Sequence, residues 1–277
     1  MSESSNLLKK QKLLDIAILA AQEGGAILKQ YWGKQLDIRE KGRSGDLITE
    51  VDQKSEEKVL SVIKRHYPDH GILAEESGTI GIQESEYLWV IDPLDGTTNY
   101  AHGYPQAAVS IGLLASGKPL VGVVYNPIRE ELWSAADGLG ATLNRVPIRV
   151  SRTNNLTNSL LVTGFAYDRR ETEDNNYAEF CYLTHLTQGV RRGGSASLDL
   201  CDVATGRLDG YWERGLKPWD LLAGVVIVKE AGGFVTAYDG SEFDLDSGRI
   251  LATNGYIHSQ LSNALGNTPH NTAFSFR

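Results

Sequence analysis

The N-terminal part of the chain carries apolar side chains at helical spacing. Between residues 9 and 32 they recur every three or four positions, which predicts a long amphipathic helix, slightly weakened by Gly24 and Gly25. A second helix is expected over residues 51–67. Residues 68–71 end it, because proline removes a backbone donor and glycine tolerates the turn. Between the two helices, residues 46–49 interrupt the pattern.

From residue 71 onward the apolar runs become shorter and typical of strands. Strands are predicted at 71–74, 87–91, 107–115, 119–125 and 131–136, with a hairpin-type turn at Ser116, Gly117 and Lys118. The second half predicts strands at 159–164, 208–213, 232–238 and 250–253, and helices at 176–187, 196–205, 218–231 and 257–265. Strands that alternate with helices in this way indicate a layered α/β or α+β fold.

A polar, β-like stretch at residues 144–150 predicts a soft domain boundary. It would separate an N-terminal α+β part, residues 1–146, from a C-terminal α/β part, residues 147–265. Residues 266–277 continue no apolar period, so we expect a frayed tail there.

Composition places the chain among soluble globular proteins. Of its 277 residues, 41% are hydrophobic and 22% charged. No run of about eighteen apolar residues predicts a membrane span, and the N-terminus lacks the order of a secretory signal. The two cysteines, Cys181 and Cys201, give no disulfide framework and are expected as buried thiols in a reducing cytoplasm.

The net charge of −8 argues against a nucleic-acid surface, which needs clustered positive charge. It leaves phosphate substrates open, because a divalent metal can supply positive charge locally. Acidic residues gathered at one site would be needed to hold that metal.

The strongest chemical signal is the sequence Trp-Val-Ile-Asp-Pro-Leu-Asp-Gly-Thr-Thr-Asn at residues 89–99. An apolar strand delivers Asp92 at its end, and Asp95 follows three residues later. Gly96 permits a tight turn, and the two threonines after it offer hydroxyl and N–H groups to an anion. Paired carboxylates suit Mg²⁺ and repel each other without a cation. A surface turn with capping aspartates is the alternative, but the complete string favours a functional site.

Other acidic residues stand where elements begin or end. Glu75 and Glu76 follow a short strand; adjacent glutamates are often a solvated pair, but at this place we expect Glu75 to bind a metal and Glu76 to support it. Asp220 immediately precedes an apolar helical run, where its residue type suits a helix N-cap and a metal ligand about equally. Asp52 opens a helix and is suited to stabilise the helix dipole.

Two further segments are weaker signals. The basic, glycine-rich residues 189–197 precede a predicted helix and are of a type that binds anions, although a structural loop is slightly favoured for the pattern alone. The polar loop at residues 41–46 is equally consistent with simple solvent exposure. The six histidines show no metal-binding spacing, and no serine-hydrolase elbow or Walker-type loop occurs.

Three segments in this order resemble the inositol monophosphatase family of lithium-sensitive, metal-dependent phosphatases. They are Gly-Ile-Leu-Ala-Glu-Glu-Ser at 71–77, the string from Trp89 extended to Pro105, and Trp219-Asp220 through the Glu-Ala-Gly-Gly at 230–233. The resemblance covers residues 8–265. It implies an α+β fold, a layered α-β-α-β-α sandwich of the inositol monophosphatase and fructose-1,6-bisphosphatase type, usually assembled as a homodimer.

The resemblance also implies roles for individual residues. Metal ligands would be Glu75, Asp92, the Leu94 carbonyl, Asp95 and Asp220, and most of them lie in the N-terminal part. Thr97 with Asp52 would position and deprotonate the attacking water, with Glu75 also in the catalytic set, and Gly96 and Thr97 would present N–H groups to the phosphate. Gly194, Ser195, Ala196, Glu213 and Asp220 would contact the substrate, and Lys41, Glu76, Thr98 and Asp199 would support the site. Ser195 stands where threonine is frequent in the family, which bears on selectivity.

The expected function is Mg²⁺-dependent hydrolysis of a small phosphate monoester, with inositol 1-phosphate first. Two or three Mg²⁺ ions per site are implied, with Mn²⁺ as a substitute and Li⁺ as an inhibitor. Histidinol phosphate, fructose 1,6-bisphosphate, a sugar 1-phosphate and a 3′-phosphoadenosine nucleotide are alternative substrates. A different class of function is also open, because some bacterial relatives are binding partners of the transcription machinery. An intact set of carboxylates favours catalysis.

Overall fold

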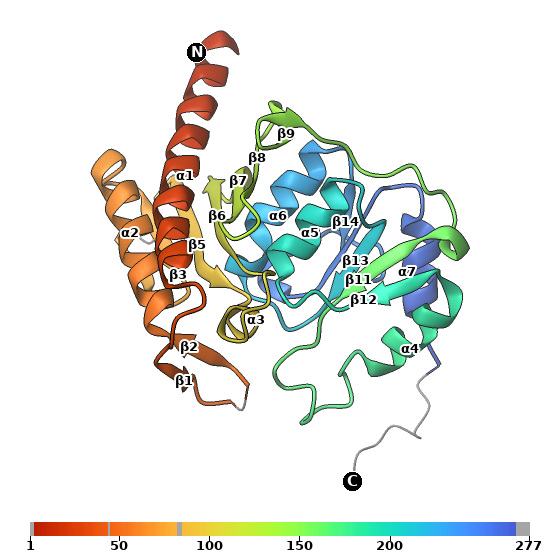
Figure 1. Ribbon diagram of the computed structural model, residues 1–277. Helices are drawn as coiled ribbons and strands as arrows, with labels where there is room; N and C mark the ends of the chain where they lie inside the picture. The colour runs from red at the N-terminus through yellow and green to blue at the C-terminus, as the bar shows by residue number, and fades with distance from the viewer. Residues whose placement is uncertain (1–2, 44, 82–84, 270–277) are drawn as a thin grey trace.

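Helices and sheets alternate in five layers in the computed structural model, which describes residues 3–43, 45–81 and 85–269 (Figure 1). The outer helices α1 (Glu3–Tyr31) and α2 (Glu50–His66) cover one face of an eight-stranded sheet. Helices α5 (Ala196–Ala204) and α6 (Pro218–Glu230) lie between this sheet and a five-stranded sheet. Helices α4 (Tyr177–Leu186) and α7 (His258–Gly266) cover the far face. The expected α-β-α-β-α sandwich is confirmed.

The eight-stranded sheet places the acidic residues that end or follow strands β3 and β5 next to each other. Its order is β10-β9-β8-β7-β6-β5-β3-β4, with β3 (Gly71–Ala74), β4 (Gly78–Ile80), β5 (Tyr87–Asp95), β6 (Ala108–Ala115), β7 (Lys118–Asn126), β8 (Glu131–Ala136), β9 (Gly140–Leu143) and β10 (Val146–Pro147). Strands β3 and β5 are parallel, and Ala74 lies beside Ile91. The residues after both strands therefore lie close together. The predicted turn between β6 and β7 is confirmed, with positive φ angles at Ser116 and Gly117.

The five-stranded sheet has the order β12-β11-β13-β15-β14. Its strands are β11 (Leu160–Thr163), β12 (Gly189–Arg191), β13 (Gly210–Glu213), β14 (Phe234–Thr236) and β15 (Ile250–Thr253). The glycine-rich segment predicted as a loop thus begins as strand β12, which is parallel to β11. The strand predicted at residues 232–238 is shorter than expected. Of the two cysteines expected as buried thiols, Cys201 is buried but Cys181, on the outer helix α4, is exposed.

Several short elements differ from the predictions. The interruption at residues 46–49 is a strand, β2 (Leu47–Thr49), which pairs with β1 (Ile38–Glu40). Helix α1 begins six residues earlier than predicted, and β5 extends through Asp95 instead of ending at Ile91. The short helix α3 (Thr97–Ala101), strand β4 and the 3-10 turns η1 (Leu156–Asn158) and η2 (Leu245–Ser247) were not predicted.

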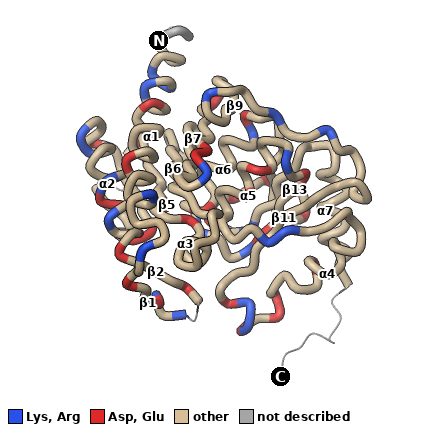
Figure 2. The backbone as a smooth tube through the Cα atoms, viewed as in Figure 1, with Lys and Arg blue, Asp and Glu red and all other residues tan. Residues whose placement is uncertain are grey.

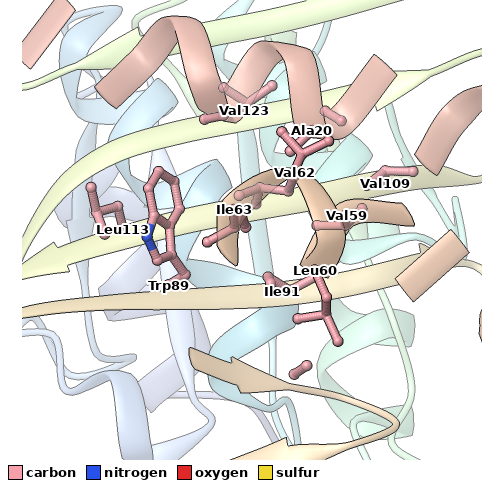
Figure 3. Close-up of a cluster of buried hydrophobic side chains, with 14 of the residues drawn as sticks. Ala20, Val59, Leu60, Val62, Ile63, Trp89, Ile91, Val109, Leu113 and Val123 are labelled. Atoms are coloured by element: carbon pink, nitrogen blue, oxygen red, sulfur yellow. The ribbon is translucent and has the colours of Figure 1, made fainter. Parts of the chain in front are cut away.

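Apolar packing fixes these layers. Figure 3 shows Val59 and Ile63 of α2 facing Trp89 and Ile91 of β5, and all four are fully buried. Helix α6 is buried from residue 221 to 228, as expected of a helix that is apolar all round and lies between two sheets. It lies so near β7 that a Cβ atom on Gly122 would be 2.3 Å from the Ala223 carbonyl oxygen.

Charged residues of both signs are interspersed along the outer helices α1 and α2 (Figure 2). No helix in the described part of the chain combines the length and apolar character needed to cross a bilayer. The first sheet ends at Pro147 and the second begins at Leu160, whereas the division into parts 1–146 and 147–265 stays a prediction. Of the expected frayed tail, Thr268 is buried and its hydroxyl donates to the Ala264 carbonyl, while residues 270–277 lie outside the described residues.

Candidate active site

Three aspartates meet where β5 ends and α6 begins. Oxygen atoms of Asp92, Asp95 and Asp220 all lie within 4.8 Å of one another. Asp92 is 2% exposed and Asp95 is 8% exposed, so two of the three carboxylates are almost removed from water. All three line a cavity of about 240 Å³.

The end of β5 is shaped to present its two aspartates. The pairing with β6 shifts register between Asp92 and Asp95, and Asp92 Oδ1 accepts a hydrogen bond of 2.9 Å from the Leu94 N–H. Asp95 Oδ2 accepts hydrogen bonds from the hydroxyl of Ser195 (2.7 Å) and from both the N–H (2.8 Å) and the hydroxyl (2.5 Å) of Ser197. One oxygen of Asp95 is thereby tied to the start of α5.

Asp220 reaches the site because α6 approaches the sheet closely. It is the third residue of α6, and its carboxylate accepts a hydrogen bond of 2.7 Å from the Lys217 N–H. Lys217, not Asp220, is therefore the N-cap residue, which corrects the expectation that Asp220 itself caps the helix. The Ser110 hydroxyl on β6 donates to the Trp219 carbonyl at 3.1 Å, which fixes this helix start against the sheet.

The carboxylates of this cluster are largely buried and repel one another, so a bound cation would stabilise them. Burial, followed by the charges of neighbouring carboxylates, raises the pKa values of Asp92 and Asp220 well above the usual range. Burial also raises the pKa of Asp95, although the serine hydrogen bonds oppose the shift. A set of oxygen donors without sulfur or imidazole suits a hard divalent cation. The residues present therefore fit a divalent metal.

Glu75 stands beside this cluster at the end of β3. Its N–H donates to the Ile91 carbonyl at 3.1 Å, which continues the pairing of β3 with β5. The ammonium group of Lys41 lies 2.8 Å from a Glu75 carboxylate oxygen and also bonds Glu76. Burial raises the pKa of Glu75, and the nearby charge of Lys41 opposes that shift.

Asp52 and Thr97 connect helix α2 to the turn after β5. The Thr97 hydroxyl lies 3.1 Å from Asp52 Oδ1 and 3.0 Å from the Leu94 carbonyl, so its single proton can serve either acceptor. Asp52 Oδ2 accepts bonds from the N–H (2.8 Å) and hydroxyl (2.6 Å) of Thr49. Burial raises the pKa of Asp52 to about 6. Gly96 permits the tight turn through its φ of 91°.

The start of α5 and the end of β13 carry most of the residues expected to contact the substrate, but none of these lines the cavity. Gly194 has a φ of 86°, and Ser195 is the N-cap of α5 and is followed by Ala196. Glu213 ends β13, where the Tyr211 hydroxyl donates to it at 2.6 Å and burial raises the pKa of Glu213 to about 7. Asp199 is buried in α5, with its carboxylate packed against the backbone of Gly193.

The structure brings many of the sequence-predicted residues to one cavity but leaves Gly194, Ala196, Asp199 and Glu213 outside its lining. Eight of them line the cavity: Lys41, Glu75, Asp92, Leu94, Asp95, Gly96, Thr97 and Asp220. Asp52, Glu76 and Ser195 contact these residues through the bonds described above, and Thr98 is exposed on the first turn of α3.

Sequence reasoning missed other residues of the site. The further cavity-lining residues are Asp46, Leu47, Tyr167, Gly215, Lys217 and Trp219. Lys217 and Trp219 stand beside Asp220 in the sequence and could have been included on that signal. Tyr167 follows β11 and has no local signal, because its place in the site depends on how two distant loops meet.

An α-β-α-β-α sandwich with grouped buried carboxylates at a cavity has the parts that a metal-dependent phosphoric monoester hydrolase needs. The model of the Inositol monophosphatase family matches residues 9–269, and the chain belongs to this family. The protein is accordingly a phosphoric monoester hydrolase of a family that depends on divalent metals.

Two similar proteins are named as inositol monophosphatases, and a third has a different name. The chain is 64% identical to an inositol-1-monophosphatase of Synechocystis over 94% of its own length and 90% of that protein. It is similar to the solved structure of an inositol monophosphatase from Anabaena, with a TM-score of 0.88 and 59% identity, over 95% of this chain and 99% of that one. It is also 41% identical to the Nus factor SuhB of Pasteurella multocida, over 91% of this chain and 95% of that one.

Proposed function

We propose that this protein hydrolyses inositol 1-phosphate to inositol and phosphate, with Mg²⁺ as its metal. The observation that carries the proposal is the buried group of Asp92, Asp95 and Asp220, whose oxygens lie within 4.8 Å of one another beside the Thr97 turn. The similarity to proteins named inositol-1-monophosphatase supports the substrate.

Glu75, Asp92, the Leu94 carbonyl, Asp95 and Asp220 would hold two or three ions. When bound, Mg²⁺ supplies the positive charge that a phosphate dianion and its leaving oxygen require. Mn²⁺ would be able to replace it, and Li⁺ would inhibit by taking a metal position with too little charge.

The chain's own groups orient the water and the phosphate. The Thr97 hydroxyl, 3.1 Å from Asp52, would position the attacking water, and Asp52 would take its proton through Thr97. A pKa of about 6 for Asp52 suits proton acceptance near neutral pH. The N–H groups of Gly96 and Thr97 would hold phosphate oxygens, which fixes the in-line direction of attack.

The start of α5 and the end of β13 would receive the alcohol. Gly194 and Ala196 would contact it through the backbone, and Glu213, accepting from Tyr211 on one side, would accept from substrate hydroxyls. Ser195 would act mainly through its bond to Asp95. Lys41, Glu76, Thr98 and Asp199 would support the site, and the enzyme would work as a cytoplasmic homodimer.

The test is phosphate release from a substrate panel. Inositol 1-phosphate, histidinol phosphate, fructose 1,6-bisphosphate, galactose 1-phosphate and phosphoadenosine phosphate would each be tried with Mg²⁺, with EDTA and with added Li⁺. We expect Mg²⁺-dependent turnover, fastest on inositol 1-phosphate, that falls at least about a hundredfold in Asp95→Asn. A faster rate on another substrate would replace inositol 1-phosphate as the substrate. No turnover in folded, Mg²⁺-binding protein would refute the catalytic proposal.

A second candidate is a role as a binding partner of the transcription machinery. The observation that favours it is 41% identity to proteins named Nus factor SuhB. The two roles are compatible in one protein. Binding of transcription factors that persists in an Asp95→Asn protein without turnover would establish a role independent of catalysis.

A further inference from the structure

Helix α2 presents one polar face to the site. Asp52, Ser55 and Glu56 are spaced as positions i, i+3 and i+4, so they lie on the same side of the helix. All three are buried, with exposures of 0%, 0% and 3%. Because they are buried, these polar side chains need hydrogen-bond partners within the protein.

Each of these side chains bonds a different segment of the candidate metal site. Asp52 accepts from Thr97, and the Ser55 hydroxyl donates to the Pro93 carbonyl at 2.8 Å, between the two aspartates of β5. Glu56 Oε2 accepts from the Glu76 N–H at 3.0 Å, and Glu56 Oε1 accepts from the Ser77 hydroxyl. The turn after β3 is thus bonded through both oxygens of Glu56.

The Glu56 contacts define where Glu75 stands. On one side, the Glu75 N–H is fixed to β5 through the Ile91 carbonyl. On the other side, the next peptide N–H is fixed to α2 through Glu56. The Glu75 side chain therefore extends from a backbone segment that is hydrogen-bonded to β5 at Glu75 and to α2 at the next residue. These two attachments fix the direction in which the Glu75 side chain extends toward the aspartates of β5.

We propose that Glu56 is a positioning residue for divalent-metal binding, because it holds the turn that carries Glu75 at a fixed distance from Asp92. The inference rests on the proposed function only in taking Glu75 as a metal ligand. Carboxylates behind metal ligands set affinity by fixing the orientation of the ligand, and their loss typically weakens metal binding by ten- to a hundredfold. Glu56 differs from a residue that merely stabilises the fold, because its bonds go to the ligand-bearing turn alone.

The test is direct binding of Mn²⁺ to the whole, substrate-free protein, measured by calorimetry or by electron paramagnetic resonance. Glu56→Gln keeps the shape of the side chain but places an amide where one of the two acceptors stood. We expect its Mn²⁺ dissociation constant to rise about tenfold. We also expect kcat at saturating metal to stay within about threefold of wild type, because Glu56 does not touch the substrate.

Glu57→Gln is the matched control, since it removes the same charge from the exposed neighbouring position of α2. Its dissociation constant should equal that of wild type. Ser77→Ala removes only one of the two Glu56 bonds and should weaken Mn²⁺ binding by about threefold. It decides the question if Glu56→Gln does not fold.

A Mn²⁺ dissociation constant within twofold of wild type in folded Glu56→Gln would overturn the proposal, even if that variant melted at a lower temperature. Equal losses in Glu56→Gln and Glu57→Gln would overturn it too, since they would show a general charge effect. Wild-type protein that binds Mn²⁺ but releases no phosphate would refute the proposed function and leave the positioning role of Glu56 intact.

Discussion

Helix α6 packs so closely on Gly122 of β7 that the methyl group of a Gly122→Ala variant should push the helix away from the sheet. An added Cβ would lie 2.3 Å from the Ala223 carbonyl oxygen and 3.0 Å from the carbonyl carbon, both of which are backbone atoms. Because ordinary contacts require more than 3 Å, α6 would have to move by about 1 Å. Overpacking of this kind costs about 3 kcal/mol, so Gly122→Ala should melt about 6–10 °C below wild type.

The same displacement should affect the active site. Asp220 lies three residues before Ala223 on α6, less than one helical turn away. A misplacement of about 1 Å can cost about a hundredfold in rate, so we expect phosphate release to fall by roughly that factor. Thermal unfolding followed by circular dichroism, together with phosphate release at saturating Mg²⁺, measures both effects.

The control is Gly266→Ala, because a Cβ on Gly266 at the end of α7 would meet no atom within 4 Å. It should leave both the melting temperature and the rate unchanged. A Gly122→Ala protein that melts within 1 °C of Gly266→Ala and keeps its rate would show that α6 is not held at this distance. The argument for how Asp220 reaches the site would then be wrong.

Further predictions concern pH and substrate choice. Burial, with the charge of Lys9, lowers the pKa of His70 below its usual 6.5, and its Nδ1 accepts a hydrogen bond from the Trp89 indole. The neutral ring therefore stabilises the fold above pH 6.5 and loses that contribution as the pH falls toward the lower folded-state pKa. Urea unfolding of His70→Gln between pH 7 and 5 should show a smaller loss of stability than wild type, and an identical slope would contradict this. Tyr167 lines the cavity and is 47% exposed, so its ring is available to cover a cyclic alcohol. Tyr167→Ala should reduce kcat/KM for inositol 1-phosphate about tenfold but leave acyclic glycerol 2-phosphate within twofold, and Tyr167→Phe should resemble wild type. Equal losses on both substrates would exclude a role in ring recognition.

The long elements of the fold were predictable from their apolar patterns. The buried positions of helix α2 recur at helical spacing, whereas strands β6 to β8 are continuous apolar runs, typical of strands that are covered on both faces. Strands β1, β2 and β4 have three residues each, too few for an alternation, and they form only because a partner strand lies beside them. The first turns of α1 gave no signal, since Leu7 and Leu8 are exposed and pack against no core.

The candidate site was predictable where its chemistry is local. Asp92, Asp95 and Glu75 follow apolar strands, so their positions could be read from the chain itself. Ser195 was expected to contact the alcohol, but its hydroxyl donates to Asp95, a residue 100 positions away. The second serine on Asp95, Ser197, was missed because such a contact depends on where α5 begins relative to β5.

The hydrogen bonds of the aspartates explain how an acidic cage can exist before a metal binds. Asp92 accepts from the Leu94 N–H, Asp95 from the Ser197 N–H and Asp220 from the Lys217 N–H. Each carboxylate is thus held by a backbone donor within two or three residues of it or at the start of an adjoining helix. For Asp220, burial and then the neighbouring carboxylates raise the pKa, and the Lys217 N–H opposes that shift. Because each backbone donor fixes only one oxygen, the three carboxylates are oriented in advance, and a bound metal would not require the loops to be rebuilt.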